Sequence, residues 1–187
     1  MPNGHHWSEA ESKKVEDHSC IQVETMSIPP NEGRDYPHKT EDTWISENII
    51  PLYHYDTPAD LAYELEGSLS KNIASVFSGH LKDNSYVLPE TKCASLGAIK
   101  VPAQNLEFYK DSENKLRIKI RDNDGEKYDL RVTCRYLRDV LDKMNGLKKL
   151  NEQLKEMTFA HVRVGLAKPY YKQNNHCFLM CNGVFLY

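Results

Sequence analysis

The sequence predicts a β-rich fold, all-β to α+β, for this chain of 187 residues. Many short segments alternate apolar and polar side chains, which is typical of strands with one buried face. The few helical patterns stand between groups of strands and do not alternate with them, so a doubly wound parallel sheet is not indicated. No internal repeat of fixed period is present.

The first expected element is a strand over residues 20–28, after a polar segment, 1–19, that we expect to be irregular or disordered. Residues 29–39 contain prolines that interrupt regular structure. One or two short strands are predicted over 43–55, around Pro51.

A helix is predicted to begin at Pro58, since proline favours the first helical position. Thr57 can cap this helix, and Asp60 stands three residues later, where a capping box needs an acceptor. Leucines then recur at helical spacing on one face. A second helix is predicted over 70–81, with three apolar side chains turned inward. They are Ile73, Val76 and Phe77.

The second half of the chain returns to strand patterns over 85–88, 94–101 and 106–110. A hairpin follows over 116–132, and Gly125 stands in its turn, where a left-handed residue is commonly needed.

A helical insertion over 134–157 is expected next, capped by Thr133. Leucines and methionines follow helical spacing within it, interrupted by Asn145 and Gly146. Two further strands complete the chain. They are 161–166 and 177–187.

Composition indicates a reduced, cytoplasmic setting. The five cysteines are an odd, scattered set, and the N-terminus has no apolar core that would mark a secretory signal. No apolar run approaches the roughly 20 residues of a membrane span. The charge is divided unequally: residues 1–100 carry 8 Lys and Arg against 16 Asp and Glu, whereas 101–187 carry 16 against 11. An anionic partner would therefore dock on the second half.

The hairpin is the first candidate site, because strand alternation places its cations on one surface. They are Arg117, Lys119, Arg121, Lys127 and Arg131, with Asp129 among them. Such a surface suits a polyanion whose bases stack on nearby rings, for which Phe108, Tyr109 and Tyr136 are close in sequence. The alternative is a solvated sheet face on which Lys and Arg discourage edge pairing.

A second candidate is the segment "RVGLAKPYY", which combines cations and aromatic rings ahead of the last strand. Its residues are Arg163, Lys168, Tyr170 and Tyr171. Pro169 would stiffen this loop as a phosphate and base platform. The alternative is that the tyrosines cover one end of the fold while Lys168 lies in solvent.

Metal and catalytic candidates have structural alternatives. His176, Cys177 and Cys181 cluster, but "CFLMC" resembles a buried strand more than a zinc knuckle, so core cysteines are favoured. The turn "DNDGE" could bind Mg²⁺ or Ca²⁺, although turn chemistry alone explains its residues. We predict no metal, no cofactor and no catalytic activity.

The last third is similar to a known family. Residues 126–133 and 161–187, "EKYDLRVT" and "HVRVGLAKPYYKQNNHCFLMCNGVFLY", resemble the closing half of the prokaryotic dual OB-containing domain family. Residues 35–45 and 93–109 are similar to that family's middle segments. The resemblance covers about residues 20–187.

There are departures from the family. The N-terminus lacks the usual aliphatic strand and glycine-rich turn, and Cys134 stands where the family commonly has Asp. The resemblance implies two small OB-like barrels with helical insertions, over 20–92 and 93–187. It also implies a nucleic-acid-binding role, in a family often found among prokaryotic defence and conflict systems.

Two functions follow from these observations. One is a nucleic-acid-binding OB-type module for single-stranded DNA or RNA, in which cations contact phosphates and tyrosines stack on bases. The other is a protein-interaction or scaffold subunit that uses the acidic first half and the 135–157 helices. Those helices carry a basic side that could extend the cationic surface. Its residues are Arg135, Arg138, Lys148 and Lys149.

Overall fold

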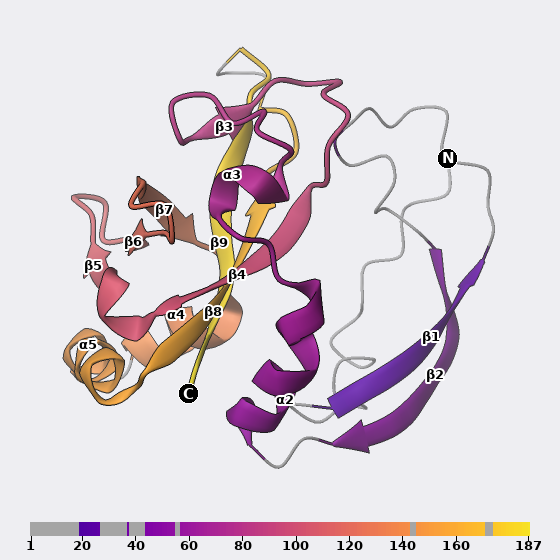
Figure 1. The fold of residues 1–187 in the computed structure, drawn as a ribbon, viewed down its shortest axis with the longest axis horizontal. Helices are drawn as coiled ribbons and strands as arrows, with labels where there is room; N and C mark the ends of the chain where they lie inside the picture. The colour runs from indigo at the N-terminus through magenta and orange to yellow at the C-terminus, as the bar shows by residue number, and fades with distance from the viewer. Residues whose placement is uncertain (1–18, 27–36, 38–43, 55–56, 143–144, 171–173) are drawn as a thin grey trace.

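A computed structural model of the chain describes residues 19–26, 37, 44–54, 57–142, 145–170 and 174–187. The predicted β-rich fold is confirmed, because the largest unit is a seven-stranded mixed sheet with a few helices (Figure 1). Its strands are β3 (Tyr86–Val87), β4 (Leu96–Pro102), β5 (Leu106–Lys110), β6 (Leu116–Arg121), β7 (Lys127–Val132), β8 (Phe159–Leu166) and β9 (Cys177–Leu186). A separate antiparallel pair consists of β1 (Ser19–Met26) and β2 (Trp44–His54).

The helices are short. They are α2 (Pro58–Leu65), α3 (Ile73–Val76), α4 (Arg135–Asp142) and α5 (Gly146–Glu156), with 3-10 turns η2 (Glu66–Ser68) and η3 (Ala103–Asn105). The predicted capping box is confirmed, since Thr57 and Asp60 each accept the other's backbone N–H. The helix predicted over 70–81 is wrong in length, because Asn72 caps α3 at its start and Gly79 turns left-handed (φ +75°) just after it. No helix of the described part has the length and apolar character to cross a membrane.

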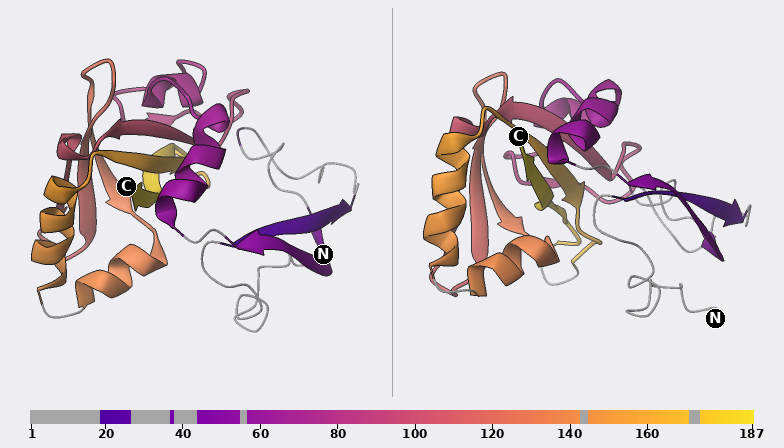
Figure 2. Two further views of the ribbon diagram at one scale, coloured as in Figure 1. Left: turned by 60° about the horizontal axis from the view of Figure 1, so that its bottom comes forward. Right: turned by 90° about the horizontal axis from the view of Figure 1, so that it is seen from below.

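The order of strands makes the large sheet curl. Across the sheet the strands follow β4, β8, β9, β7, β6 and β5, with β3 added on β9. All neighbours are antiparallel except β7 and β9. The edge strands β4 and β5 are consecutive in the chain and separated only by η3, so the sheet bends until its edges approach each other there (Figure 2). Within the described residues no ladder joins β4 to β5, and the sheet is not closed into a barrel.

Both edges of the curled sheet are covered by hydrogen bonds from other elements. On β5, the Asn151 amide of α5 accepts from the Phe108 N–H (2.9 Å) and donates to the Phe108 carbonyl (2.8 Å). On β4, the Ala98 carbonyl accepts from the Ser70 N–H at 2.9 Å. Uncovered edges invite pairing with other chains, so these contacts protect the sheet.

The turn between β6 and β7 ties the curled sheet together. The Asn123 amide donates to the carbonyls of Lys71 and Lys100, at 2.8 and 2.9 Å. Asp122 is buried, and its carboxylate accepts the Ile73 N–H at 3.3 Å and two N–H groups of its own turn at 3.1 Å. Side-chain hydrogen bonds thus connect this turn to β4, where strand pairing does not. We call Asp122 and Asn123 the clasp.

The hydrophobic core fills the inside of the curl. Its largest fully buried aliphatic and aromatic side chains come from α3, from the residue that follows α3, and from strands β3 to β8. They include Phe77, Phe108, Ile73, Ile99, Ile118, Ile120 and Leu130. Contact between α3 and β4 depends on Gly97, because a Cβ there would lie 2.5 Å from Cγ1 of Val76.

The division into barrels over 20–92 and 93–187 stays a prediction. In the described residues β3 pairs with β9, and Phe77 and Val87 share one hydrophobic core with the large sheet. Segments on both sides of residue 92 therefore contribute to the same packed unit.

Candidate functional site

The outer face of β5, β6 and β7 carries the cations of the predicted hairpin. Buried and solvent-facing residues alternate along β6 and β7, as the sequence predicts. The register sets Arg117 opposite Arg131 and Arg121 opposite Lys127, while Lys119 faces Asp129. All five cations therefore lie on one face, which we call the outer face.

Carboxylates on the outer face neutralise Arg117 and Lys119. Arg117 Nε lies 2.9 Å from Asp129 Oδ1 and 3.0 Å from the Tyr109 hydroxyl. Lys119 Nζ lies 3.1 Å from Glu107 Oε2. Burial, and then the hydrogen bond to Asp129, raise the pKa of Tyr109, so its hydroxyl stays protonated and donates to Asp129 at 2.6 Å. These contacts join three strands and leave less unpaired charge than the sequence predicted.

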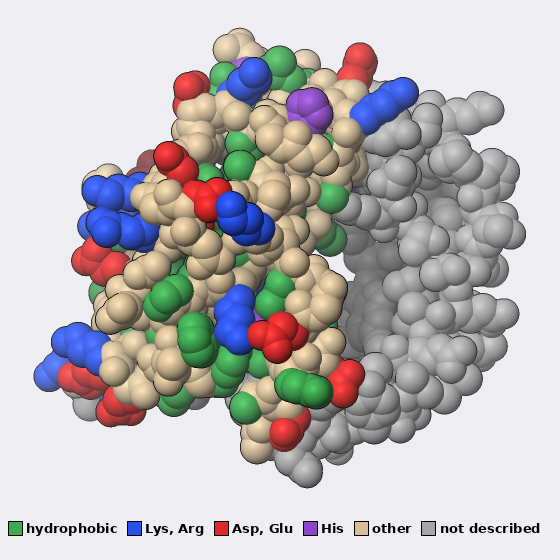
Figure 3. Space-filling model, in the orientation of Figure 1, with side chains coloured by type: hydrophobic (Ala, Val, Ile, Leu, Met, Phe, Trp, Pro, Cys, Tyr) green, Lys and Arg blue, Asp and Glu red, His purple; other side chains and the backbone are tan. Residues whose placement is uncertain are grey.

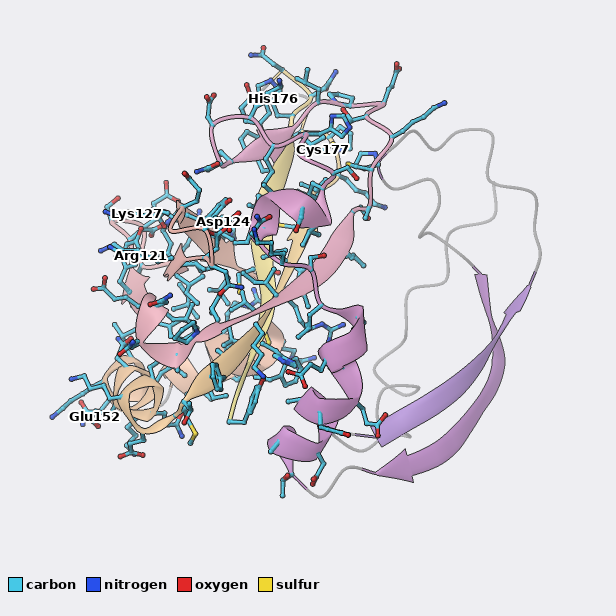
Figure 4. The ribbon with its side chains drawn as sticks, in the orientation of Figure 1. Arg121, Asp124, Lys127, Glu152, His176 and Cys177 are labelled. Atoms are coloured by element: carbon cyan, nitrogen blue, oxygen red, sulfur yellow. The ribbon has the colours of Figure 1, made fainter. Side chains whose placement is uncertain are left out.

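The other hairpin cations are exposed and have no carboxylate partner within the described part of the chain. Arg121 and Lys127 lie side by side at the end of the hairpin (Figure 4), directly opposite each other in register. A blue cluster of Lys and Arg is visible over this part of the sheet in Figure 3. Like charges directly opposite each other destabilise a strand pair, and a bound anion would reduce the repulsion between them.

An open depression of about 640 Å³ lies beside these cations. It runs from η3 across the outer face, and polar side chains make up much of its lining. They include Gln104, Asn105, Glu107, Lys119, Arg121 and Lys127. Arg121 and Lys127 offer donors to an anionic ligand there, while Glu107 and Asp129 add two carboxylates to the lining.

An aromatic cluster that the sequence reasoning missed lies on β3 and at the start of β9. The rings of Tyr86 and His176 stack in parallel, with centroids 3.8 Å apart and planes 3° apart. Phe178 is tilted against both, at 6.1 and 5.8 Å. We call Tyr86, His176 and Phe178 the aromatic cluster. The one signal in the sequence was the spacing of His176 and Phe178, which places them on the same face of a strand.

The aromatic cluster shares the outer face with the cations. Arg131 of β7 is the partner of Met180 on β9, and Phe178 precedes Met180 by two residues on the same side. Strand spacing and rise place the Cα atoms of Arg131 and Phe178 about 8 Å apart. Cations and rings can therefore contact one extended ligand.

The loop after β8 contacts this cluster through the backbone, and the Ala167 N–H donates to the Phe178 carbonyl at 2.7 Å. Tyr170 is exposed and bridges to His176, whose carbonyl accepts the Tyr170 N–H at 3.2 Å. Lys168 is exposed near it, and Tyr171 lies outside the described residues. Arg163 instead lies over the Phe185 ring (5.8 Å) on the β8–β9 part of the sheet, so it is not grouped with the hairpin cations.

The acidic turn and the cysteines serve the fold. The Asp122 carboxylate is occupied by backbone N–H groups, and Asp124 is paired with Lys71 at 3.2 Å. Burial raises the pKa of Cys177 and raises that of Cys181 to about 12, which disfavours the thiolate that a metal needs. Within the described residues no three His, Cys, Asp or Glu side chains are grouped to hold a metal ion.

The helical insertion packs on the sheet. Leu150 and Leu154 of α5 are buried, while Thr133, expected to cap a helix, donates its hydroxyl to Asn182 Oδ1 at 3.0 Å. Two of the basic residues proposed for its outer side are paired on their own helices. Arg135 pairs with Asp139 at 3.9 Å and Lys148 with Glu152 at 3.8 Å. Each of these pairs neutralises one of the four basic residues proposed for the helices.

A buried histidine lies on the opposite part of the sheet, away from the hairpin. The side chain of His161 is 1 % exposed, and its Nε2 lies 2.8 Å from the Tyr187 hydroxyl. Its Nδ1 has no hydrogen-bond partner among the described residues. Lys100 lies nearby, held 2.7 Å from Glu66 and over the Tyr187 ring. Burial, with the charge of Lys100 adding to it, lowers the pKa of His161.

This lowered pKa predicts a loss of stability in mild acid. The unfolded chain takes up a proton at His161 near pH 6.5, whereas the folded chain resists it. The free energy of unfolding should therefore fall as the pH drops below about 6.5. Urea unfolding at pH 7.5 and pH 5.5 would measure this fall, and His161→Gln should make it smaller. An equal fall in both proteins would contradict the prediction.

Comparison with protein-family models, curated proteins and solved structures finds no match to this chain. The resemblance to the dual OB-containing family stays a prediction.

Proposed function

We propose that this chain is a nucleic-acid-binding module of the OB type, with its ligand on the outer face. In an OB fold, which is a five-stranded and partly open barrel, the face of strands two and three binds oligonucleotides together with two loops. If β4 and β5 count as the halves of one bent strand, strands two and three are β6 and β7. The loops that join strands one to two and four to five are then 111–115 and 167–176. This correspondence supports the proposal.

The observation that carries the proposal is the charge of the outer face. Arg121, Lys127 and Arg131 are exposed, lack a carboxylate partner among the described residues, and lie along a single hairpin. The phosphates of a nucleic acid are spaced along a chain and can pair with such a row, releasing counterions. An isolated small anion would use only part of it.

Binding of fluorescent oligonucleotides at increasing salt tests this function. Three phosphate contacts predict a slope of log K against log salt of about −2 for a single strand and nearer −3 for a duplex. The combined charge reversals R121E, K127E and R131E should abolish binding. Lys82→Glu, Lys92→Glu and Lys155→Glu, made together at exposed lysines outside the hairpin and the depression, change the net charge equally and are the matched control.

Two results would contradict the proposal. One is no oligonucleotide binding by the unchanged protein at low salt. The other is an equal loss of affinity in the outer-face variant and the control variant. The first result, combined with a stable complex between this chain and another protein, would favour the scaffold function.

A further inference from the structure

We infer that the aromatic cluster is a stacking site for nucleobases, so that the ligand is a single strand with unpaired bases. This inference rests on the proposed function and adds to it the side chains on which the bases stack. It assigns the rings of Tyr86, His176 and Phe178 to bases and the hairpin cations to phosphates.

The rings are arranged in advance for stacking. Tyr86 and His176 are parallel at 3.8 Å, and Phe178 supports both from the side. Backbone pairing fixes all three, because Tyr86 is the ladder partner of Phe178 and His176 bridges to Tyr170. A ligand therefore needs to immobilise little of the protein on binding, which favours affinity.

The rings are also accessible. All three side chains are partly exposed, and Figure 4 shows His176 near one end of the molecule, close to β3. In β9 the buried residues alternate with partly exposed ones, so His176 and Phe178 turn away from the core while Cys177 turns into it. A base can reach the cluster from the solvent side without displacing core residues.

The position of the cluster relative to the cations fits a nucleotide chain. A hydrogen bond between two loops connects the cluster to the cations. The Asn84 amide, two residues before Tyr86, donates at 3.1 Å to the carboxylate of Glu126, which is next to Lys127. Arg131, at the other end of β7, lies near the cluster because it pairs with Met180 on β9. A strand crossing β7 toward β3 would therefore meet phosphate-binding cations first and rings next.

Stacking on protein rings selects for unpaired bases. In a duplex each base is covered above and below by its neighbours, whereas the bases of a single strand can separate and lie on a side chain. Base–aromatic stacking tolerates any sequence, because every base has a π face. We therefore expect little sequence preference.

The decisive comparison uses two probes of equal length and charge, an oligothymidine and an abasic oligomer with the same backbone. The unchanged protein should bind the oligothymidine about 5- to 140-fold more tightly, from the typical contribution of one stacked base. The double variant with Tyr86→Leu and His176→Gln should lose that advantage and keep its affinity for the abasic oligomer and its salt slope. Tyr63→Leu together with His80→Gln, on exposed residues elsewhere, is the matched control.

A second measurement needs no variant. A single strand that contains 2-aminopurine should lose fluorescence when its base stacks on the cluster, and the same base within a duplex should not respond.

The outcomes separate this inference from the proposed function. Equal affinity of the unchanged protein for the oligothymidine and the abasic oligomer would overturn base stacking and leave the cationic face in place. Tighter binding of a duplex than of the single strand would overturn it as well. Binding of neither probe would overturn both proposals.

Discussion

Asp122→Ala should lower the free energy of unfolding by about 3 kcal/mol or more. The Asp122 carboxylate is buried and accepts three backbone N–H groups, from Ile73, Asp124 and Glu126. Each buried donor left without a partner costs on the order of 1–3 kcal/mol, and water can reach some of them. Urea unfolding followed by circular dichroism would measure the change.

Two comparisons make the Asp122 prediction specific. Asp122→Asn keeps one acceptor oxygen and should destabilise the fold less than alanine does. Asp139→Ala, at an exposed carboxylate in an i,i+4 pair, should change stability by at most about 0.5 kcal/mol. If Asp122→Ala lowered the free energy of unfolding no more than Asp139→Ala does, the structural role assigned to the clasp would be contradicted. A stability gain on adding Ca²⁺ or Mg²⁺ would instead support a metal-binding turn.

The clasp also has a consequence for the candidate site. The β6–β7 turn connects Arg121 to Lys127, and its side chains hold it against the segment before α3 and against β4. Loosening the turn would let this cation pair move relative to the depression beside it. We therefore expect Asp122→Ala to weaken oligonucleotide binding under conditions in which the variant is still folded.

Local features of the fold could be predicted from the sequence. The 116–132 hairpin follows from alternation and from a glycine in its turn, and Gly125 indeed has φ +85°. The start of α2 follows from Thr57 and Asp60, because a capping box involves only residues three apart. Each of these signals lies within a few neighbouring residues.

The arrangement of the strands could not be predicted in the same way. The aromatic cluster brings Tyr86 together with His176 and Phe178, which are about ninety residues further along the chain. Strand alternation gives the face of a side chain but does not identify the neighbouring strand. The parallel pairing of β7 with β9, which brings the cations near the rings, depends on that missing information.

The neutralisation of two hairpin cations by carboxylates could be predicted only in part from the sequence. A hairpin turn fixes the register of its strands, so the position of Asp129 beside the cations of β6, where it pairs with Arg117, was within reach of the sequence. The Glu107 carboxylate lies on β5, and the sequence analysis did not predict that β5 pairs with β6 across the turn at 111–115. Counting cations without their cross-strand partners therefore overestimated the charge of this face.

Asn151→Ala should lower the free energy of unfolding by about 2 kcal/mol. The Asn151 side chain replaces a neighbouring strand at the edge of β5, bonding both the N–H and the carbonyl of Phe108. Removing the amide leaves both groups partly buried without partners, at about 1 kcal/mol or more for each. Urea unfolding would measure the total, and faster hydrogen exchange of the Phe108 amide would show that the edge has opened.

The effect of Asn151→Ala should extend to self-association, since an uncovered edge can pair with a second copy of the chain. Size-exclusion chromatography at increasing concentration should show more dimer or aggregate for this variant than for Gln153→Ala, an exposed position on the same helix. Gln153→Ala itself should shift stability by at most about 0.5 kcal/mol. Equal stability of the two variants would mean that α5 covers β5 through Leu150 and Leu154 alone. In that case the hydrogen bonds of Asn151 would contribute nothing measurable to the fold.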